Sequence, residues 1–182
     1  MNQNSYESDE IVAQYLEFHY GQKYFGVENY PKTCAEHCLN LMKGQSQNKA
    51  LDLGCAVGRT TFELALNFKQ VVGVDLSYSF IHCAKQLNKK KSINYHNIIE
   101  GELSTQSKVS LSELQLDENL GKVNFYQEDA CALGKQHKNY DLIFAGNLLD
   151  RLAYPQEFLN NIHKYLNIGG ILVIIAAILM FI

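Results

Sequence analysis

The sequence predicts an α/β protein built on a doubly wound, mainly parallel sheet. Short apolar runs alternate along the chain with segments of helical spacing, and parallel strands need such helical crossovers between them. One of these runs, 50–53, leads into a glycine-containing loop that opens a helix, and another, 71–75, ends in an acidic residue. In sheets of this kind, a strand that turns through glycines into a helix brings the backbone close to a ligand.

The spacing of apolar residues also predicts the order of the elements. Two helices come first, one after the N-cap Ser8 and ending at Tyr20, the other from Pro31 to just before Gly44. Strands are then expected at 50–53, 71–75, 123–126, 140–145 and 171–176, with helices over 59–67, 77–91 and 154–166. Gly169 and Gly170 are expected to end the last helix ahead of the last strand.

The stretch 93–121 departs from this alternation. It is polar and mixed, and 94–99 is a candidate extra strand. We interpret it as an insertion or as an elaborated helical region.

Composition excludes several function classes. The chain has 182 residues, of which 47% are hydrophobic, so it contains enough apolar material for a core. A net charge of −3 provides no strong basic field for nucleic acid or an anionic membrane. The apolar run 171–182 is shorter than the roughly 20 residues of a membrane-spanning helix. Small-molecule or protein partners are therefore favoured.

The cysteines point to a reducing compartment. There are 5 of them, an odd number without a regular framework, which argues against a disulfide-stapled secreted domain. The first residues lack the layout of a signal peptide. A cytoplasmic location is therefore expected. Cys34 and Cys38 lie one helical turn apart, but no further ligands follow at a suitable spacing, so no metal is expected.

The glycine loop is the most informative local motif. A dinucleotide-binding pattern starting at Gly54 would require glycine where the chain has Ala56 and Arg59, and no Walker A sequence follows. Asp52, Gly54, Ala56 and Gly58 instead match the D/E-x-G-x-G-x-G pattern, with alanine for the middle glycine. In this respect the chain resembles class I S-adenosylmethionine-dependent methyltransferases, which have a Rossmann-like fold.

That resemblance implies S-adenosylmethionine as the cofactor and suggests a role for each acid. Asp52 would position its α-ammonium group, Asp75 would accept the ribose hydroxyls, and Asp129 would meet the adenine amino group. Ala130 would lie at the ring edge and Asn147 beside the methyl group. The alternative is that Asp52 and Asp75 only cap helices or turns. The predicted cofactor-binding set is Asp52, Gly54, Cys55, Ala56, Gly58, Asp75, Leu76, Asp129, Ala130 and Asn147.

Longer segments carry a narrower resemblance. The sequences Phe-His-Tyr-Gly at 18–21 and Asn-Leu-Leu-Asp-Arg-Leu at 147–152 stand in order with 24–31, 100–103 and 129–131. This set resembles the 4-mercaptohistidine N1-methyltransferase family, found as the C-terminal domain of the ovothiol biosynthesis enzyme. The resemblance implies methyl transfer from S-adenosylmethionine to a ring nitrogen of 5-thiohistidine. It also implies a sulfoxide synthase partner or domain outside this chain.

The same resemblance directs attention to an acceptor site. Residues 1–48 are expected to form a helical cap that contributes to it, and residues 49–182 to form the cofactor-binding core. Tyr15, His19 and Asn147 are the candidates that orient the acceptor ring as catalytic residues. Tyr20, Asp150 and Arg151 are candidates for substrate binding, with Arg151 holding a carboxylate. Alternatively, Tyr15 and His19 face the core and Arg151 pairs with Asp150.

Three functional hypotheses remain open from the sequence. The family continues after the fifth strand of the sheet, so the fold is expected to be truncated there. The chain is then a thiohistidine N-methyltransferase, a class I methyltransferase with another small-molecule acceptor, or a cofactor-binding protein without catalytic activity.

Overall fold

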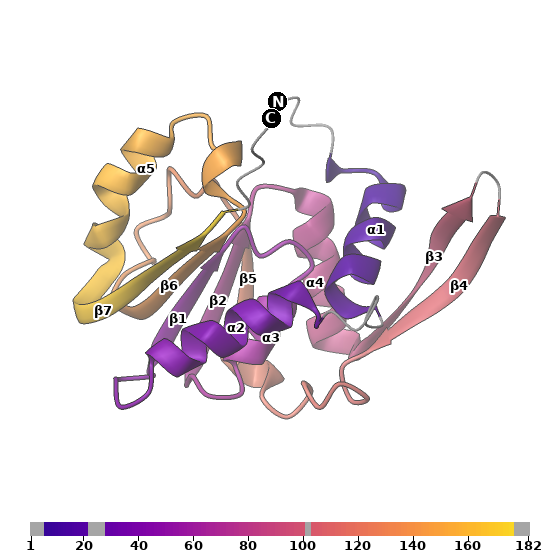
Figure 1. The fold of residues 1–182 in the computed structure, drawn as a ribbon, viewed down its shortest axis with the longest axis horizontal. Helices are drawn as coiled ribbons and strands as arrows, with labels where there is room; N and C mark the ends of the chain where they lie inside the picture. The colour runs from indigo at the N-terminus through magenta and orange to yellow at the C-terminus, as the bar shows by residue number, and fades with distance from the viewer. Residues whose placement is uncertain (1–5, 22–27, 101–102, 177–182) are drawn as a thin grey trace.

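A computed structural model describes residues 6–21, 28–100 and 103–176 (Figure 1). The segments 24–27 and 177–182 and residues 101–102, which entered the sequence analysis, lie outside these described residues. The helices are α1 (Asp9–Tyr20), α2 (Tyr30–Leu41), α3 (Arg59–Leu64), α4 (Tyr78–Lys90) and α5 (Pro155–Ile162). The strands are β1 (Lys49–Leu53), β2 (Gln70–Asp75), β3 (Ser92–Glu100), β4 (Leu103–Ser110), β5 (Val123–Gln127), β6 (Tyr140–Gly146) and β7 (Leu166–Ile175).

Five of these strands form one sheet in the order β5-β2-β1-β6-β7, with every neighbouring pair parallel. The order reverses between β1 and β6, because the chain first builds outward through β2 and β5 and then returns to the other side of β1. In open α/β sheets, ligands bind outside the carboxyl ends of the strands at such a switch point. The predicted α/β, Rossmann-like fold is confirmed.

The core has two halves, one on each face of the sheet. Ala50, Val71, Leu142 and Phe144 face a cluster that includes residues of α1 to α4. The alternate strand residues, such as Leu51 and Val72, face a second cluster with Phe158 and Ile162 of α5. In Figure 1, α5 lies on one side of the sheet and α1 to α4 lie on the other. Burial on both faces explains why the strands appear as continuous apolar runs in the sequence.

The predicted helix boundaries follow from side-chain caps. The Ser8 hydroxyl accepts a hydrogen bond from the Ile11 amide at 3.3 Å, and the Ser77 hydroxyl accepts one from the Phe80 amide at 3.1 Å. Lys91 ends α4 in a left-handed conformation with φ of 63°. The α3 helix ends at Leu64 and is thus shorter than predicted.

The segment predicted as an insertion contains the antiparallel hairpin β3–β4. The candidate strand at 94–99 is confirmed, but the interpretation of an elaborated helical region is wrong. The hairpin extends outward from the body of the molecule beside α1 (Figure 1). Its Tyr95 hydroxyl donates to the Glu17 carboxylate of α1 at 2.6 Å, and Tyr95 and Val109 are buried. In β3, the buried Tyr95 stands between the exposed Asn94 and His96, and this alternation is typical of a strand with one covered face.

The prediction for Gly169 and Gly170 was wrong. Gly169 and Gly170 do not precede the last strand, because β7 already begins at Leu166. The register jumps from the Tyr140–Leu166 pair to the Leu142–Ile171 pair, so residues 167–170 bulge out of the ladder. Gly169 supplies the left-handed turn of this bulge, with φ of 81°. Among the described residues, no helix is long and apolar enough to cross a membrane.

Candidate active site

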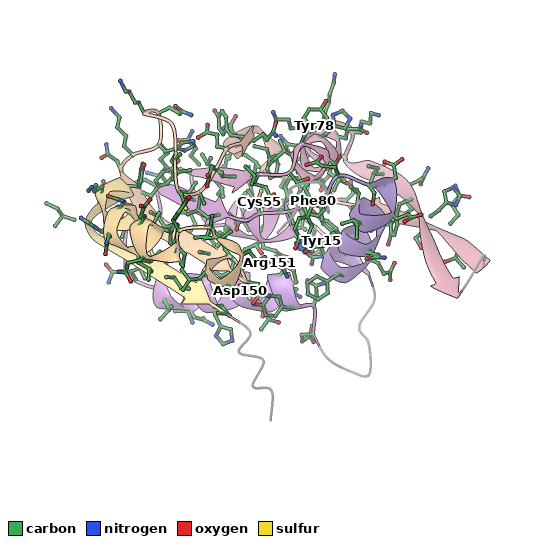
Figure 2. The ribbon with its side chains drawn as sticks, turned by 90° about the horizontal axis from the view of Figure 1, so that it is seen from above. Tyr15, Cys55, Tyr78, Phe80, Asp150 and Arg151 are labelled. Atoms are coloured by element: carbon green, nitrogen blue, oxygen red, sulfur yellow. The ribbon has the colours of Figure 1, made fainter. Side chains whose placement is uncertain are left out.

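A cavity of about 1050 Å³ opens at the carboxyl ends of β1, β2, β5 and β6. Viewed from above, Cys55, Tyr15, Phe80, Asp150 and Arg151 group around it (Figure 2). Of the fifteen residues predicted from the sequence, thirteen line the cavity: Tyr15, His19, Asp52, Gly54, Cys55, Ala56, Asp75, Leu76, Asp129, Ala130, Asn147, Asp150 and Arg151. Gly58 and Tyr20 are not among the lining residues.

The glycine loop is fastened to the end of β2. The amides of Gly54 and Cys55 both donate to the Val74 carbonyl, at 2.8 and 3.1 Å, and the Ala56 amide donates to the Asp75 carboxylate at 2.9 Å. Ala56 adopts φ of 45°, in the left-handed region where the motif ordinarily has glycine. The loop therefore keeps the backbone shape of the motif despite the alanine.

Gly58 contributes through packing. Its φ is 89°, and a Cβ on it would lie 2.8 Å from the Phe125 ring and 3.3 Å from the Ala84 Cβ. Any side chain at this position would therefore separate the loop and α3 from β5 and α4. The glycine permits this close approach and contributes nothing to the cavity wall.

Asp75 lies at the end of β2 and faces the cavity. One carboxylate oxygen accepts from the Ala56 amide, and the other accepts from the Ser77 amide at 2.9 Å. Burial raises the pKa of Asp75, while these backbone donors act in the opposite direction. Each carboxylate oxygen has two lone pairs, so both can accept a further hydroxyl donor from the cavity.

Asp52 is more deeply buried, with 1% of its surface exposed. It accepts a hydrogen bond from the Thr61 hydroxyl at 2.6 Å. Burial raises the pKa of Asp52 to about 7, even though the Thr61 hydrogen bond favours the carboxylate. A cationic group brought next to Asp52 would restore the ionised form, because an opposite charge favours ionisation.

A third loop that lines the cavity follows β5. The Asp129 carboxylate accepts from the Cys131 amide at 2.8 Å. Its neighbour Glu128 accepts from the Gly134 amide at 2.9 Å and lies 3.1 Å from the buried His137 ring nitrogen. The loop that carries Asp129 and Ala130 is thereby held against β6, because His137 also hydrogen-bonds the Tyr140 hydroxyl at 2.8 Å.

Aromatic side chains form another part of the cavity wall. The ring of Tyr15 lies 4.5 Å from that of Phe80 and 5.8 Å from that of His19, measured between centroids. Burial, with a smaller contribution from the Arg59 charge, lowers the pKa of His19 to about 3. His19 is therefore a neutral imidazole near neutral pH. Tyr15 and His19 both pack in the core and line the cavity, so the two sequence interpretations are compatible.

Tyr20 takes a supporting position behind this wall. Its hydroxyl donates to the Val57 carbonyl of the glycine loop at 2.8 Å, and the Arg59 guanidinium lies over its ring at 5.4 Å. Arg59 also pairs with Glu63 at 2.7 Å and donates to the His19 carbonyl at 3.3 Å. These contacts join the end of α1 to the glycine loop.

The segment after β6 closes the cavity on its remaining side. Asn147 adopts φ of 50°, and its amide donates to the Ile175 carbonyl at 2.7 Å. Asp150 and Arg151 follow in the short 3₁₀ helix η3 (Leu149–Arg151). The structure pairs Arg151 with Tyr6, whose hydroxyl accepts from the guanidinium.

Several lining residues were missed by the sequence analysis. Tyr6 and Glu7 come from the segment before α1, Tyr30 from the start of α2, and Phe80 from α4. The Tyr30 hydroxyl lies near the Cys34 and Asn147 side chains. Tyr30 belongs to the segment 24–31 that carries the narrower resemblance, but the resemblance gave it no role, and only tertiary packing brings these four residues to the cavity. The aromatic character of Tyr6, Tyr30 and Phe80 was a further available signal.

No metal centre emerges from the part of the chain that the structure describes, since it holds no group of three or more His, Cys, Asp or Glu suited to an ion. Cys34 and Cys38 are buried free thiols. Burial raises the pKa of Cys38 to about 12, which keeps that thiol protonated.

The cavity fits the chemistry of S-adenosylmethionine. A buried carboxyl with a raised pKa, Asp52, suits the α-ammonium group, and Asp75 has acceptor capacity for a ribose diol. Leu76 and Ala130, the sequence neighbours of Asp75 and Asp129, add apolar side chains to the cavity lining. Ligand cavities typically measure about 300–1,000 Å³, so this cavity has room for the cofactor and a small acceptor.

Comparison with known proteins agrees with this geometry. Residues 51–172 match the family model described as "Methyltransferase domain". No curated protein sequence matches the chain significantly. Many solved structures share its fold.

Three of these structures illustrate the range of sequence identity and coverage. A TehB-like SAM-dependent methyltransferase from Corynebacterium glutamicum is 24% identical, with a TM-score of 0.53 over 82% of this chain and 63% of that one. The CcbJ methyltransferase from Streptomyces caelestis is 19% identical, with a TM-score of 0.59 over 84% of this chain and 56% of that one. The [4+2]-cyclase SpnF is 16% identical, with a TM-score of 0.59 over 92% and 59%.

The match to a cyclase shows that similarity at such low sequence identity concerns the fold alone. The chain spans about half to two thirds of the length of the structures that it matches. The family match covers most of the chain and confirms the predicted methyltransferase class, whereas it specifies no acceptor. The predicted cofactor, S-adenosylmethionine, agrees with the SAM-dependent methyltransferases among the matching structures. The chain belongs to the methyltransferase domain family of class I S-adenosylmethionine-dependent enzymes.

Proposed function

We propose that this protein transfers a methyl group from S-adenosylmethionine to a ring nitrogen of a small aromatic acceptor. The observation that carries the proposal is one cavity lined by two chemically different groups of residues. Asp52, Asp75 and Asp129 form an acidic group, and Tyr15, His19 and Phe80 form an aromatic group. A polar cofactor and a flat acceptor would meet between them, near Asn147.

We further propose 5-thiohistidine as the acceptor, which would place the protein in ovothiol biosynthesis. The support is the family resemblance of the segments around 15–21 and 147–152, together with the character of the cavity. Aromatic side chains suit an imidazole ring, and a neutral His19 adds no positive charge that would repel it. Imidazole has an unperturbed pKa of about 6.5, so a nitrogen lone pair is available near neutral pH.

Arg151 is the proposed contact for the acceptor carboxylate. Among the cavity-lining residues that the structure describes, it is the one lysine or arginine, against six carboxylates: Glu7, Asp52, Asp75, Glu128, Asp129 and Asp150. An anionic group therefore finds its favourable position beside Arg151, where a guanidinium can bind a carboxylate in bidentate fashion. Asp150 is the neighbouring contact for the acceptor amine, and Tyr20 supports the wall from behind.

In this proposal the protein mainly aligns the reactants. The bound cofactor supplies a sulfonium methyl; the ring nitrogen's lone pair forms the new N–C bond, the S–C bonding pair stays on sulfur, and the ring proton leaves to solvent. Alignment with reacting atoms about 3–3.5 Å apart accounts for much of the acceleration in such reactions. Tyr15, His19 and Asn147 would hold the imidazole so that one nitrogen faces the methyl group.

A panel of acceptors with radiolabelled S-adenosylmethionine tests the proposal. The panel should contain 5-thiohistidine, histidine and the corresponding amine that lacks the carboxylate. The expected result is labelled product from 5-thiohistidine and much less from the amine. Turnover of a different small molecule would contradict 5-thiohistidine as the acceptor but would support the enzyme class. Cofactor binding without turnover of any acceptor would favour a non-catalytic binding protein.

A further inference from the structure

The residues just before α1 are built into the edge of the cavity. The two Glu7 carboxylate oxygens accept from the Tyr78 and Ser79 amides, each at 3.0 Å, in the first turn of α4. The Ser79 hydroxyl donates to the Glu7 carbonyl, also at 3.0 Å. Burial opposes ionisation of Glu7, but the hydrogen bonds from Ser79, Ser77 and Tyr78 outweigh it and lower its pKa. Glu7 thus holds this segment on α4 as a carboxylate.

Tyr6 continues from this anchor across the cavity. The Ser77 hydroxyl donates to its carbonyl at 3.0 Å. Its ring lies 5.8 Å from that of Phe80 and 6.1 Å from that of Tyr15. At its far end, the Arg151 guanidinium lies over the ring at 5.6 Å and donates to the hydroxyl.

These contacts join two loops that flank the proposed cofactor site. Ser77 follows Asp75 and Leu76 at the end of β2, whereas Arg151 follows Asn147 at the end of β6. Tyr6, Glu7, Ser77 and Arg151 all line the cavity. The chain at Tyr6–Glu7, which we name the strap, therefore runs from one rim of the cavity to the other.

We propose that the strap encloses the cofactor and that the contact between Tyr6 and Arg151 must open before the cofactor can exchange. This inference rests on the proposed function, because it takes the enclosed ligand to be S-adenosylmethionine or its product. Tyr6 and Glu7 are positioning residues in it. They hold the rim closed and hold Arg151 in place, while Asp52 and Asp75 contact the cofactor.

The strap predicts a specific kinetic signature. A contact that only adds affinity slows dissociation and leaves association unchanged. A closed strap slows both, because ligand enters and leaves through the same opening. Removing the Tyr6 hydroxyl, or the charge of Glu7, is therefore expected to raise the association and dissociation rate constants together, so that Kd changes less than either.

The test measures binding kinetics of S-adenosylhomocysteine by surface plasmon resonance on the immobilised whole chain. Tyr6→Phe keeps the ring and removes the hydroxyl, and Glu7→Gln keeps the shape and removes the charge. Matched controls are Tyr126→Phe, on β5 outside the cavity lining, and Glu36→Gln, an exposed residue that pairs with Lys32. We expect both rate constants to rise about threefold to tenfold in the strap variants and to stay within twofold of wild type in the controls, on the scale of one lost hydrogen bond.

The outcomes separate the strap from the proposed function. Wild-type rate constants in both strap variants would overturn the strap and leave cofactor binding intact. An increase in dissociation alone would also overturn it, because that pattern describes a ligand contact. Absence of binding to the wild-type chain would overturn the proposed function and the strap with it. Thermal melts of each variant confirm that it is folded, and Tyr6→Phe guards against a general loss of structure in Glu7→Gln.

Discussion

The two groups of residues proposed for the cofactor and for the acceptor are assembled in opposite ways. In the cofactor group, each residue lies at the end of a strand or within two residues of it: Gly54 after β1, Asp75 at the end of β2 and Asp129 after β5. In the acceptor group, the aromatic wall combines Tyr15, Tyr30 and Phe80 from three separate helices. The first group is fixed by strand order and backbone hydrogen bonds, whereas the second depends on how helices pack over the sheet. We therefore expect substitutions in the cofactor group to affect binding or folding strongly, and substitutions in the acceptor group to affect turnover.

The largest expected effect is on stability at the glycine loop. Gly58→Ala places a methyl group against Phe125 at a φ of 89°. Left-handed strain and overpacking together are expected to cost about 2–4 kcal/mol of unfolding free energy. Gly44→Ala is the matched control, because Gly44 also has positive φ, at 77°, but a Cβ added there would meet nothing within 4 Å. Its cost should be about 1–2 kcal/mol, from strain alone.

Urea unfolding of both variants measures this difference. An equal loss of unfolding free energy in Gly58→Ala and Gly44→Ala would contradict the role of the Phe125 contact. The loop would then be held by its backbone conformation alone.

The next effect is a pH dependence of cofactor binding. The pKa of Asp52 is raised to about 7 by burial, and a bound α-ammonium group is expected to lower it. Binding of S-adenosylhomocysteine should therefore release a proton below pH 7. Its affinity should rise with pH between 5 and 7, by up to about tenfold per pH unit. Folding stability without ligand depends on pH in the opposite direction. The folded state holds the Asp52 proton more tightly than the unfolded chain does, so this contribution to the free energy of unfolding is lost as the pH rises toward 7.

Calorimetry in two buffers of different ionisation enthalpy measures the released proton. Asp52→Asn should bind more weakly and show no such dependence. A pH-independent wild-type affinity would place the ammonium group elsewhere.

A smaller effect is expected in the acceptor group. His19→Gln replaces a neutral ring by a neutral amide, and loss of one neutral hydrogen bond to the acceptor corresponds to about 0.5–1.5 kcal/mol, or roughly twofold to tenfold in kcat/KM. Affinity for S-adenosylhomocysteine should stay within twofold. Because the pKa of His19 is about 3, the pH profile of turnover between 5 and 8 should keep its shape. A titration that disappears in His19→Gln would show that His19 ionises during the reaction.

The smallest effect is expected at Ala56. Its φ of 45° is strained for alanine, and glycine would relieve about 1 kcal/mol. Glycine also increases the entropy of the unfolded chain, which costs about 0.4–1 kcal/mol. Ala56→Gly should therefore change the unfolding free energy by less than about 1 kcal/mol and leave cofactor affinity unchanged. A loss of more than about 2 kcal/mol would show that the alanine methyl has a packing role.

The same contrast explains what could be predicted from the sequence. Asp52, Gly54 and Asp75 are found by local pattern because a buried strand, a turn and a helix follow each other within a few residues. The strap and Tyr30 carry no such pattern, and their place depends on α4 and β6, far along the chain. The β4 strand was missed because its described residues are largely polar, and only Val109 is buried. Gly169 and Gly170 suggested a helix end, although a bulge inside β7 uses the same conformational freedom.

The most direct test of the proposed cofactor site is a calorimetric titration with S-adenosylhomocysteine of wild type and Asp75→Asn. Asp117→Asn is the control, because Asp117 pairs with Lys91 and is not among the cavity-lining residues. We expect one binding site in wild type and in the control. We expect an affinity at least about 100-fold lower in Asp75→Asn, since two hydrogen bonds to a charged acceptor correspond to about 3 kcal/mol or more. Equal affinities in all three proteins, or no binding to a folded wild-type chain, would contradict the assignment of this cavity to S-adenosylmethionine.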